Sequence, residues 1–157
     1  MASRSLNDLL PVVREKAHRF TSECEKQGIE LLVYCTYRSS DEQTALYVQG
    51  REPLPVVNTL RERAGLPPIT DSANRIATKA RAGSSYHEYR CAFDCVPLEA
   101  GKPVWDDKHP LWQKIGEIGK SCGLEWAGDW KTFKEFPHFQ YTGGLSLADM
   151  KAGKVPV

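Results

Sequence analysis

The chain has 157 residues, with 21 Lys and Arg against 20 Asp and Glu, so it has the size of one ordinary domain and almost no net charge. This balance argues against the global basic field that attracts nucleic acid. No apolar run approaches the roughly 20 residues of a membrane-spanning helix, and the N-terminus does not resemble a signal peptide. We therefore expect a single domain over residues 1–157 that binds neither nucleic acid nor membrane and stays in the cytoplasm after synthesis.

The five cysteines are odd in number and scattered, which favours buried, reduced thiols over a disulfide framework. Cys91 and Cys95 bracket Asp94 at a spacing that a metal could use. No second cysteine pair completes a four-thiolate site, and a buried cysteine behaves as a small hydrophobic residue. The core interpretation of this pair is favoured, and the metal-ligand interpretation stays open.

Helical spacing of apolar residues over 5–27 predicts one long amphipathic helix. Ser5 and Asp8 resemble a capping signal at its start, and Gly28 marks its end. His18 lies beside the apolar stripe, so we expect it to be solvated or half-buried.

Residues 29–36 are rich in branched and aromatic side chains and predict a strand. Ser40 and Gln43 then predict a capping box for a short helix to about residue 49. Arg38 lies between these two elements, where a side chain is often aimed into a cleft. A surface ion pair is an equal alternative for Arg38.

Prolines interrupt residues 50–83, where a short helix is expected at 56–64. We interpret this part as a long excursion packed over the sheet, as a wall or lid of a cleft. The remaining expected elements are a core strand at 91–97, a partner strand at 102–105, a helix from His109-Pro110 to about 122, a short strand at 136–141 and a small helix at 145–151.

Two short stretches carry residues suited to metal chemistry. The first offers His87 and Asp94, and the second offers His138 with Glu135 three residues before it. Two imidazoles and one carboxylate form the ligand set of a catalytic zinc, which keeps a fourth position open for water. Zinc lowers the pKa of such a water to about 7, and Glu135 is then free to act as general base.

Each half alone is a weak signal, but several motifs occur together in one order. They are Tyr37-Arg38-Ser39, Ser85-x-His87, Ala92-x-Asp94, Trp126-Ala127-Gly128-Asp129-Trp130 and Glu135-x-Pro137-His138-Phe139. This set resembles the phage endolysin L-alanyl-D-glutamate peptidases. That family is similar to the zinc-dependent D-alanyl-D-alanine dipeptidases and carboxypeptidases and to the hedgehog signalling domain. The resemblance runs from about residue 5 to 150 and is poor over 51–80.

The resemblance implies an α+β fold, with a small antiparallel sheet flanked by helices and one Zn²⁺ in a groove across the sheet. The residues that it implies are His87, Asp94 and His138 as zinc ligands, Glu135 as catalytic base, Arg38 as substrate-carbonyl partner, and Ser85 as a hydroxyl that supports a ligand or contacts the substrate. We further expect Gln43, Tyr86 and Trp130 to contact the substrate.

Three positions depart from the family pattern. Arg90 stands where relatives commonly have glycine, so a left-handed turn there carries a strain of about 1 kcal/mol. Ala127 replaces a common glycine of the tryptophan motif. Glu135 stands where many endolysins have aspartate, which keeps the chemistry and matches the dipeptidase branch.

The expected function is that of a bacteriolytic endolysin that cuts the L-Ala–D-Glu bond of peptidoglycan stem peptides during host lysis. We expect a monomer that stays in the cytoplasm of the infected host until it is released to the cell wall. One alternative is a D-Ala–D-Ala dipeptidase or carboxypeptidase. The alternative from another class is a binding module in which zinc only stabilises the fold.

Overall fold

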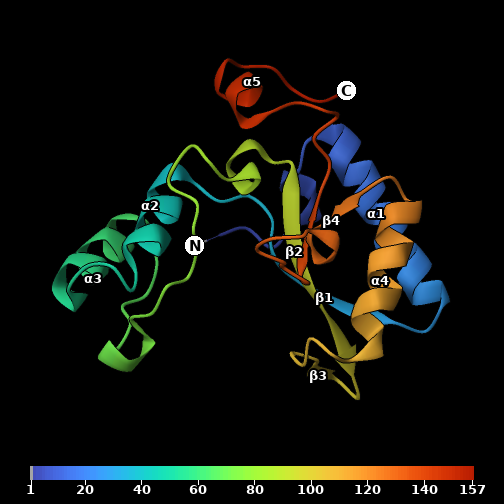
Figure 1. Cartoon of the computed structure of the whole chain (residues 1–157), viewed down its shortest axis with the longest axis horizontal. Helices are drawn as coiled ribbons and strands as arrows, with labels where there is room; N and C mark the ends of the chain where they lie inside the picture. Colours follow the sequence, from blue (N-terminus) through green and yellow to red (C-terminus); the bar gives the residue numbers. More distant parts are fainter. Residues whose placement is uncertain (1) are drawn as a thin grey trace.

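The computed structural model describes residues 2–157 (Figure 1). A five-stranded antiparallel sheet has the order β1-β2-β5-β4, and β3 pairs with β2 off this path. The strands are β1 (Glu30–Cys35), β2 (Ala92–Glu99), β3 (Lys102–Pro103), β4 (Glu125–Trp126) and β5 (His138–Gln140). The expected α+β fold with a small antiparallel sheet is confirmed.

Five α-helices accompany the sheet in the part of the chain that the structure describes: α1 (Pro11–Lys26), α2 (Ser40–Val48), α3 (Leu54–Arg63), α4 (Pro110–Ser121) and α5 (Leu147–Lys151). Figure 1 shows α1 and α4 side by side along the sheet, whereas α2 and α3 form a pair set apart from them. None of the helices between residues 2 and 157 has the length and apolar character needed to cross a bilayer.

The first expected helix is wrong at its start. Leu6–Asp8 forms a separate 3-10 turn that Ser5 caps, and α1 begins only at Pro11. The residue before a proline is driven out of the helical region, and Leu10 accordingly has an extended backbone (φ −57°, ψ 148°). His18, on α1, is exposed as expected.

The capping box of α2 is shifted by one residue from the expected one. Ser39 accepts a hydrogen bond from the Glu42 amide, and the Glu42 carboxylate accepts one from the Ser39 amide. Gln43, expected in that box, instead points into the molecule and is fully buried. The following helix, α3, begins at Leu54, slightly before the expected 56.

The two faces of β2 and β5 have opposite characters. Phe93 and Phe139 are paired across the strands and stack at 5.7 Å between ring centroids. Both rings contact Phe20 of α1, and they belong to the main hydrophobic core with α4. Because successive strand residues point to opposite faces, the neighbouring polar pair faces away from this core.

The cysteines are all free and buried, as expected, among the described residues. Cys24, Cys95 and Cys122 lie in the main hydrophobic core. Burial raises the pKa of the Cys91 thiol to about 11, which keeps it protonated at neutral pH. These properties fit the core interpretation of Cys91 and Cys95.

Helix α4 lies unusually close to the strands because two of its residues lack side chains. A Cβ added to Gly116 would lie 2.3 Å from the Trp126 ring, and one added to Gly119 would lie 2.5 Å from the Phe139 ring. The helix therefore rests directly on Phe139, the residue after His138, and on Trp126 of the tryptophan motif.

We expect Gly116→Ala to lower the free energy of unfolding by about 2 kcal/mol, because the overpacked methyl group displaces Trp126. Helix propensity alone predicts the opposite sign, since alanine is favoured over glycine by about 1 kcal/mol. Urea unfolding followed by fluorescence measures the change. Lys114→Ala, at an exposed position of the same helix, is the control, and a Gly116→Ala protein as stable as that control would contradict the close packing.

Candidate active site

The site is built on a cross-strand pair that faces away from the hydrophobic core. Asp94 of β2 is directly opposite His138 of β5, and Asp94 Oδ1 lies 3.2 Å from His138 Nδ1. His87 reaches the same oxygen from the 3-10 turn Tyr86–Tyr89, with its Nε2 at 3.3 Å. The three side chains proposed from the sequence as metal ligands therefore converge on one point.

Hydrogen bonds behind both rings determine which nitrogen faces Asp94. His87 Nδ1 lies 2.8 Å from the carbonyl oxygen of Thr36, which only accepts, so this nitrogen carries the proton. His138 Nε2 lies 2.8 Å from Gln140 Oε1, and the Gln140 amide donates to Glu125 at 2.8 Å. Since the amide nitrogen of Gln140 is committed to Glu125, its oxygen accepts from His138. Both imidazoles thus direct their inner nitrogen, His87 Nε2 and His138 Nδ1, toward Asp94, where a metal ion would take the place of any proton on that nitrogen.

The separations of Asp94 from each of the two histidines fit a tetrahedral zinc ion. Ligand atoms about 2.0–2.1 Å from such an ion are separated from one another by roughly 3.3 Å. The separations of 3.3 and 3.2 Å from Asp94 Oδ1 to the two ring nitrogens match that value. Neutral imidazoles held by partners on their outer nitrogens are also the usual form of histidine ligands.

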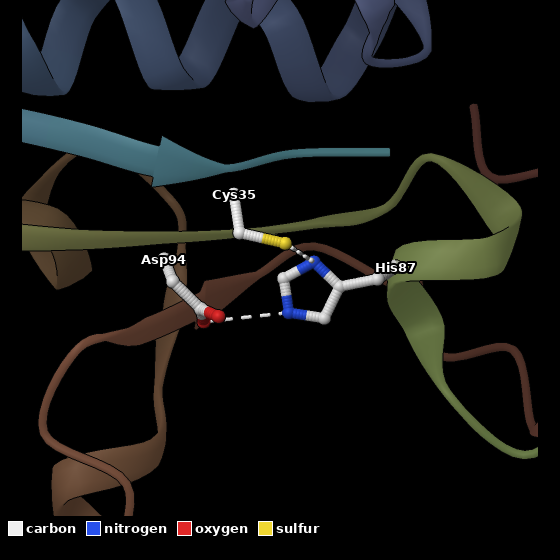
Figure 2. Close-up of side chains that lie close together, drawn as sticks. All are labelled: Cys35, His87 and Asp94. Carbon is white, nitrogen blue, oxygen red and sulfur yellow. Dashed lines mark hydrogen bonds and ion pairs between the residues drawn. The ribbon is translucent and has the colours of Figure 1, made fainter. Parts of the chain in front are cut away.

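Cys35 is a fourth metal-binding group close to His87 and Asp94. Figure 2 shows that its sulfur approaches one side of the His87 ring while Asp94 approaches the other. The sulfur lies 3.7 Å from Nδ1, the nitrogen already bonded to Thr36. Cys35 therefore lies on the side of the His87 ring that faces away from Asp94 Oδ1. His138, whose Nδ1 approaches that same oxygen, is the better third ligand.

Electrostatics tie the two histidines to Asp94. Burial alone would lower the pKa of His87, but the Asp94 carboxylate outweighs it and raises that pKa to about 10. Burial alone would raise the pKa of Asp94, but His87 and His138 hold it well below its usual value. This ion pair balances the negative charge of the Asp94 carboxylate, as a bound metal cation would.

Glu135 stands beside the three converging groups without joining them. Its carboxylate is 58% exposed and lies 3.9 Å from His138 Nδ1. Its backbone amide donates to the carbonyl of Ala127, and Trp126 Nε1 donates to the carbonyl of Phe136. The tryptophan motif thus fixes the loop that carries Glu135. Ala127 contributes to this through its backbone carbonyl and not through its side chain.

Arg38 has a largely buried, well-anchored guanidinium, 14% exposed, not the surface ion pair that was its alternative. Nη1 donates to Gln43 Oε1 at 3.0 Å, Nη2 lies 3.3 Å from Cys35 Sγ, and Nη2 is 3.9 Å from Asp94. Gln43 in turn donates to the carbonyl of Ala80 at 2.7 Å. The side chain is therefore held next to the converging groups by residues of β1, α2 and the excursion.

A cavity of about 790 Å³ opens over these groups, in the size range of ligand sites. Its lining includes Ser85, Tyr86 and Trp130, three of the expected substrate contacts, but not Gln43, which lies beneath Arg38. Residues 76–80 line it as well, so part of the excursion forms a wall of the cavity as expected. Lys79 of this wall lies over the Phe133 ring, with its Nζ 3.4 Å from the centroid.

Comparison with known proteins places this arrangement in a family. The peptidoglycan L-alanyl-D-glutamate endopeptidase CwlK of Bacillus subtilis (strain 168) is 33% identical over 142 residues, which are 85% of this chain and 74% of that protein. The chain belongs to the L-alanyl-D-glutamate endopeptidase family. The L-alanyl-D-glutamate peptidase of Listeria phage A118 is 30% identical over 144 residues, which are 88% of this chain but only 41% of that protein.

A family model described as D-alanyl-D-alanine carboxypeptidase matches residues 78–141, the part that holds the converging groups. Among solved structures, the L-Ala D-Glu endopeptidase ChiX of Serratia marcescens has a TM-score of 0.54 at 23% identity, covering 96% of this chain and 92% of that one. The vancomycin-resistance D,D-pentapeptidase VanY, solved with Zn(II), has a TM-score of 0.58 at 14% identity, covering 92% and 78%. These structures share the fold.

The turn at Arg90 confirms the left-handed conformation expected where relatives of this endopeptidase family commonly have glycine. Its φ is 60° and its ψ is 29°. The guanidinium lies over the Tyr37 ring at 3.9 Å and donates to the carbonyl of Asp8 at 2.8 Å. These contacts of the side chain offset the backbone strain and fasten the N-terminal turn beside the site.

Three positioning residues escaped the sequence analysis. Gln140 was detectable, because it lies two residues after His138 in a strand and so shares its face. Glu125 could not be detected from the sequence, because only the pairing of β4 with β5 brings it opposite Gln140. Cys35 was assigned only as a buried thiol, since nothing local reveals that β1 brings it opposite Asp94.

In metal-free protein we expect stability to fall as the pH rises from 6.5 toward 10. The folded chain keeps a proton on His87 up to a pKa of about 10, whereas the unfolded chain releases it near 6.5. The folded state therefore binds more protons in this window, and its stabilisation, complete below pH 6.5, is lost as the pH increases. Thermal unfolding in the presence of a chelator measures this slope. Asp94→Asn removes the carboxylate that raises the His87 pKa and should therefore flatten the slope. An equal slope in that variant would show that the His87–Asp94 pair is not the cause.

Proposed function

We propose that the protein is a zinc-dependent peptidoglycan peptidase that hydrolyses the L-Ala–D-Glu bond of stem peptides. The observation that carries this proposal is the approach of His87 and His138 to the same oxygen of Asp94, at separations that suit a tetrahedral zinc site, with Glu135 beside them in an open cavity. Membership of the endopeptidase family supports the choice of bond.

His87 Nε2, Asp94 Oδ1 and His138 Nδ1 would hold one Zn²⁺. When bound, zinc supplies a Lewis acid that polarises the scissile carbonyl and lowers the pKa of a water toward neutrality. Glu135 accepts a proton from the attacking water and transfers it to the departing amine of D-Glu. Its exposure keeps the carboxylate accessible to both partners.

Arg38 stabilises the negative charge that develops on the carbonyl oxygen during attack. The guanidinium is suited to this role because Gln43 and Cys35 hold it in place before substrate arrives. Gln43 therefore acts through Arg38, and Ser85, Tyr86 and Trp130 contact the substrate directly from the cavity wall.

We further propose that the protein acts as a monomer in the lysis of a bacterial host, reaching the wall from the cytoplasm. The phage relative named L-alanyl-D-glutamate peptidase supports this role. The family model described as D-alanyl-D-alanine carboxypeptidase favours a second candidate, the release of terminal D-Ala. Mass spectrometry of digested peptidoglycan separates the two, because the first creates a new D-Glu amino terminus and the second releases D-Ala alone.

We expect Glu135→Gln to lower hydrolysis about 10³-fold while zinc remains bound, because the amide cannot accept the proton. The rate is followed on purified peptidoglycan, and bound zinc is counted by metal analysis. Asp129→Asn is the matched control, since Asp129 is an exposed carboxylate paired with Lys120 outside the cavity lining. Activity of the Glu135→Gln protein near that of the control would remove Glu135 from the mechanism.

We expect Gln140→Ala to weaken zinc binding at least tenfold, because His138 loses the acceptor that fixes its ring. Competition with a fluorescent chelator measures the affinity. Gln113→Ala, at an exposed position of α4, should leave it unchanged. Equal affinities in the two variants would show that Gln140 does not orient the ligand.

A further inference from the structure

An exposed tryptophan stands in the lining of the catalytic cavity and has no part in the proposed chemistry. Trp105 follows β3 and is 59% exposed, although large aromatic side chains are usually mostly buried. Its ring meets the Tyr34 ring edge-on, with centroids 5.7 Å apart at 68°. Both residues line the cavity that contains His87 and Asp94. The indole ring is thus largely exposed at the site and contacts a second ring from β1.

A free carboxylate lines the same cavity as this aromatic pair. Asp107, two residues after Trp105, also lines the cavity, and its side chain makes no hydrogen bond or ion pair with any of residues 2–157. An aromatic face packs well against the C–H face of a pyranose ring, and a carboxylate accepts hydrogen bonds from two hydroxyl groups. Together these groups offer the chemistry that binds a sugar.

The cavity has room for more than the two residues that flank the scissile bond. Its volume of about 790 Å³ lies in the upper part of the range for drug-sized ligands. In peptidoglycan the L-Ala is joined through a lactyl group to a sugar of the glycan strand, so this sugar lies next to the bond that is cut. Lys79 and Lys134, elsewhere in the lining, suit the carboxylates that follow D-Glu instead.

We propose that Trp105, Tyr34 and Asp107 form a subsite for the pyranose ring that carries the stem peptide. This inference rests on the proposed function, because the sugar is placed by the bond that is hydrolysed. Its consequence is that the protein prefers stem peptides attached to glycan over free stem peptides. Trp105 is accordingly a specificity-determining residue.

The test compares two soluble substrates, a muramyl tripeptide and the same tripeptide without the sugar. Trp105→Ala should lower kcat/KM about tenfold for the muramyl tripeptide, the size expected for a lost ring contact, and change it less than twofold for the free peptide. Trp105→Phe keeps a ring face and should restore most of the difference. Circular dichroism and bound zinc establish that each variant is folded and loaded.

Phe133→Ala is the matched control, because Phe133 is a second exposed aromatic residue, 64% accessible, in the same lining. It should change both substrates by the same factor. An equal effect of Trp105→Ala on the two substrates overturns the sugar subsite while leaving the proposed function standing. Absence of cleavage of either substrate by the wild-type protein overturns the proposed function, and the subsite with it.

Discussion

The pairing of β2 with β5 is the constraint on which the site depends. It places Asp94 directly opposite His138, and the pairing of β1 with β2 places Cys35 at the same level on the other side. Since side chains alternate between the faces of a sheet, a slip of one residue would turn Asp94 into the core and Phe93 into the cavity. The backbone register therefore fixes the relative positions of Asp94 and His138.

The opposite face of the sheet fixes that register. Phe93 and Phe139 occupy the core beside Phe20, and α4 packs against Phe139 where Gly119 leaves no side chain between them. A shifted pairing would bury a carboxylate and an imidazole among these rings without the partners that they now have, which is costly. Hydrophobic packing on one side thus holds polar groups in position on the other.

Local patterns were sufficient for much of this arrangement. The strand-like alternation around Asp94 and the spacing of Glu135 and His138 each lie within one segment and could be recognised there. That the two segments share a site was predicted only from their combination and from the family resemblance. The start of α1 was mispredicted because apolar periodicity continues through Leu10, where Pro11 prevents the helix from extending backwards. The hydrogen bonds that link His138 through Gln140 to Glu125 depend on the pairing of β4 with β5, and no short stretch of sequence contains that information.

The excursion that forms one wall of the cavity is stabilised largely by its own polar contacts. Arg61 donates to Gln49 and to the carbonyl of Pro67, and Asn58 exchanges two hydrogen bonds with the backbone of Ile69. The sheet that holds His138 takes no part in these contacts. Residues 50–78 can therefore change in length or charge without moving the strands that carry Asp94 and His138. A change in this wall would alter the shape and charge of the cavity while the strands that carry Asp94 and His138 keep their pairing.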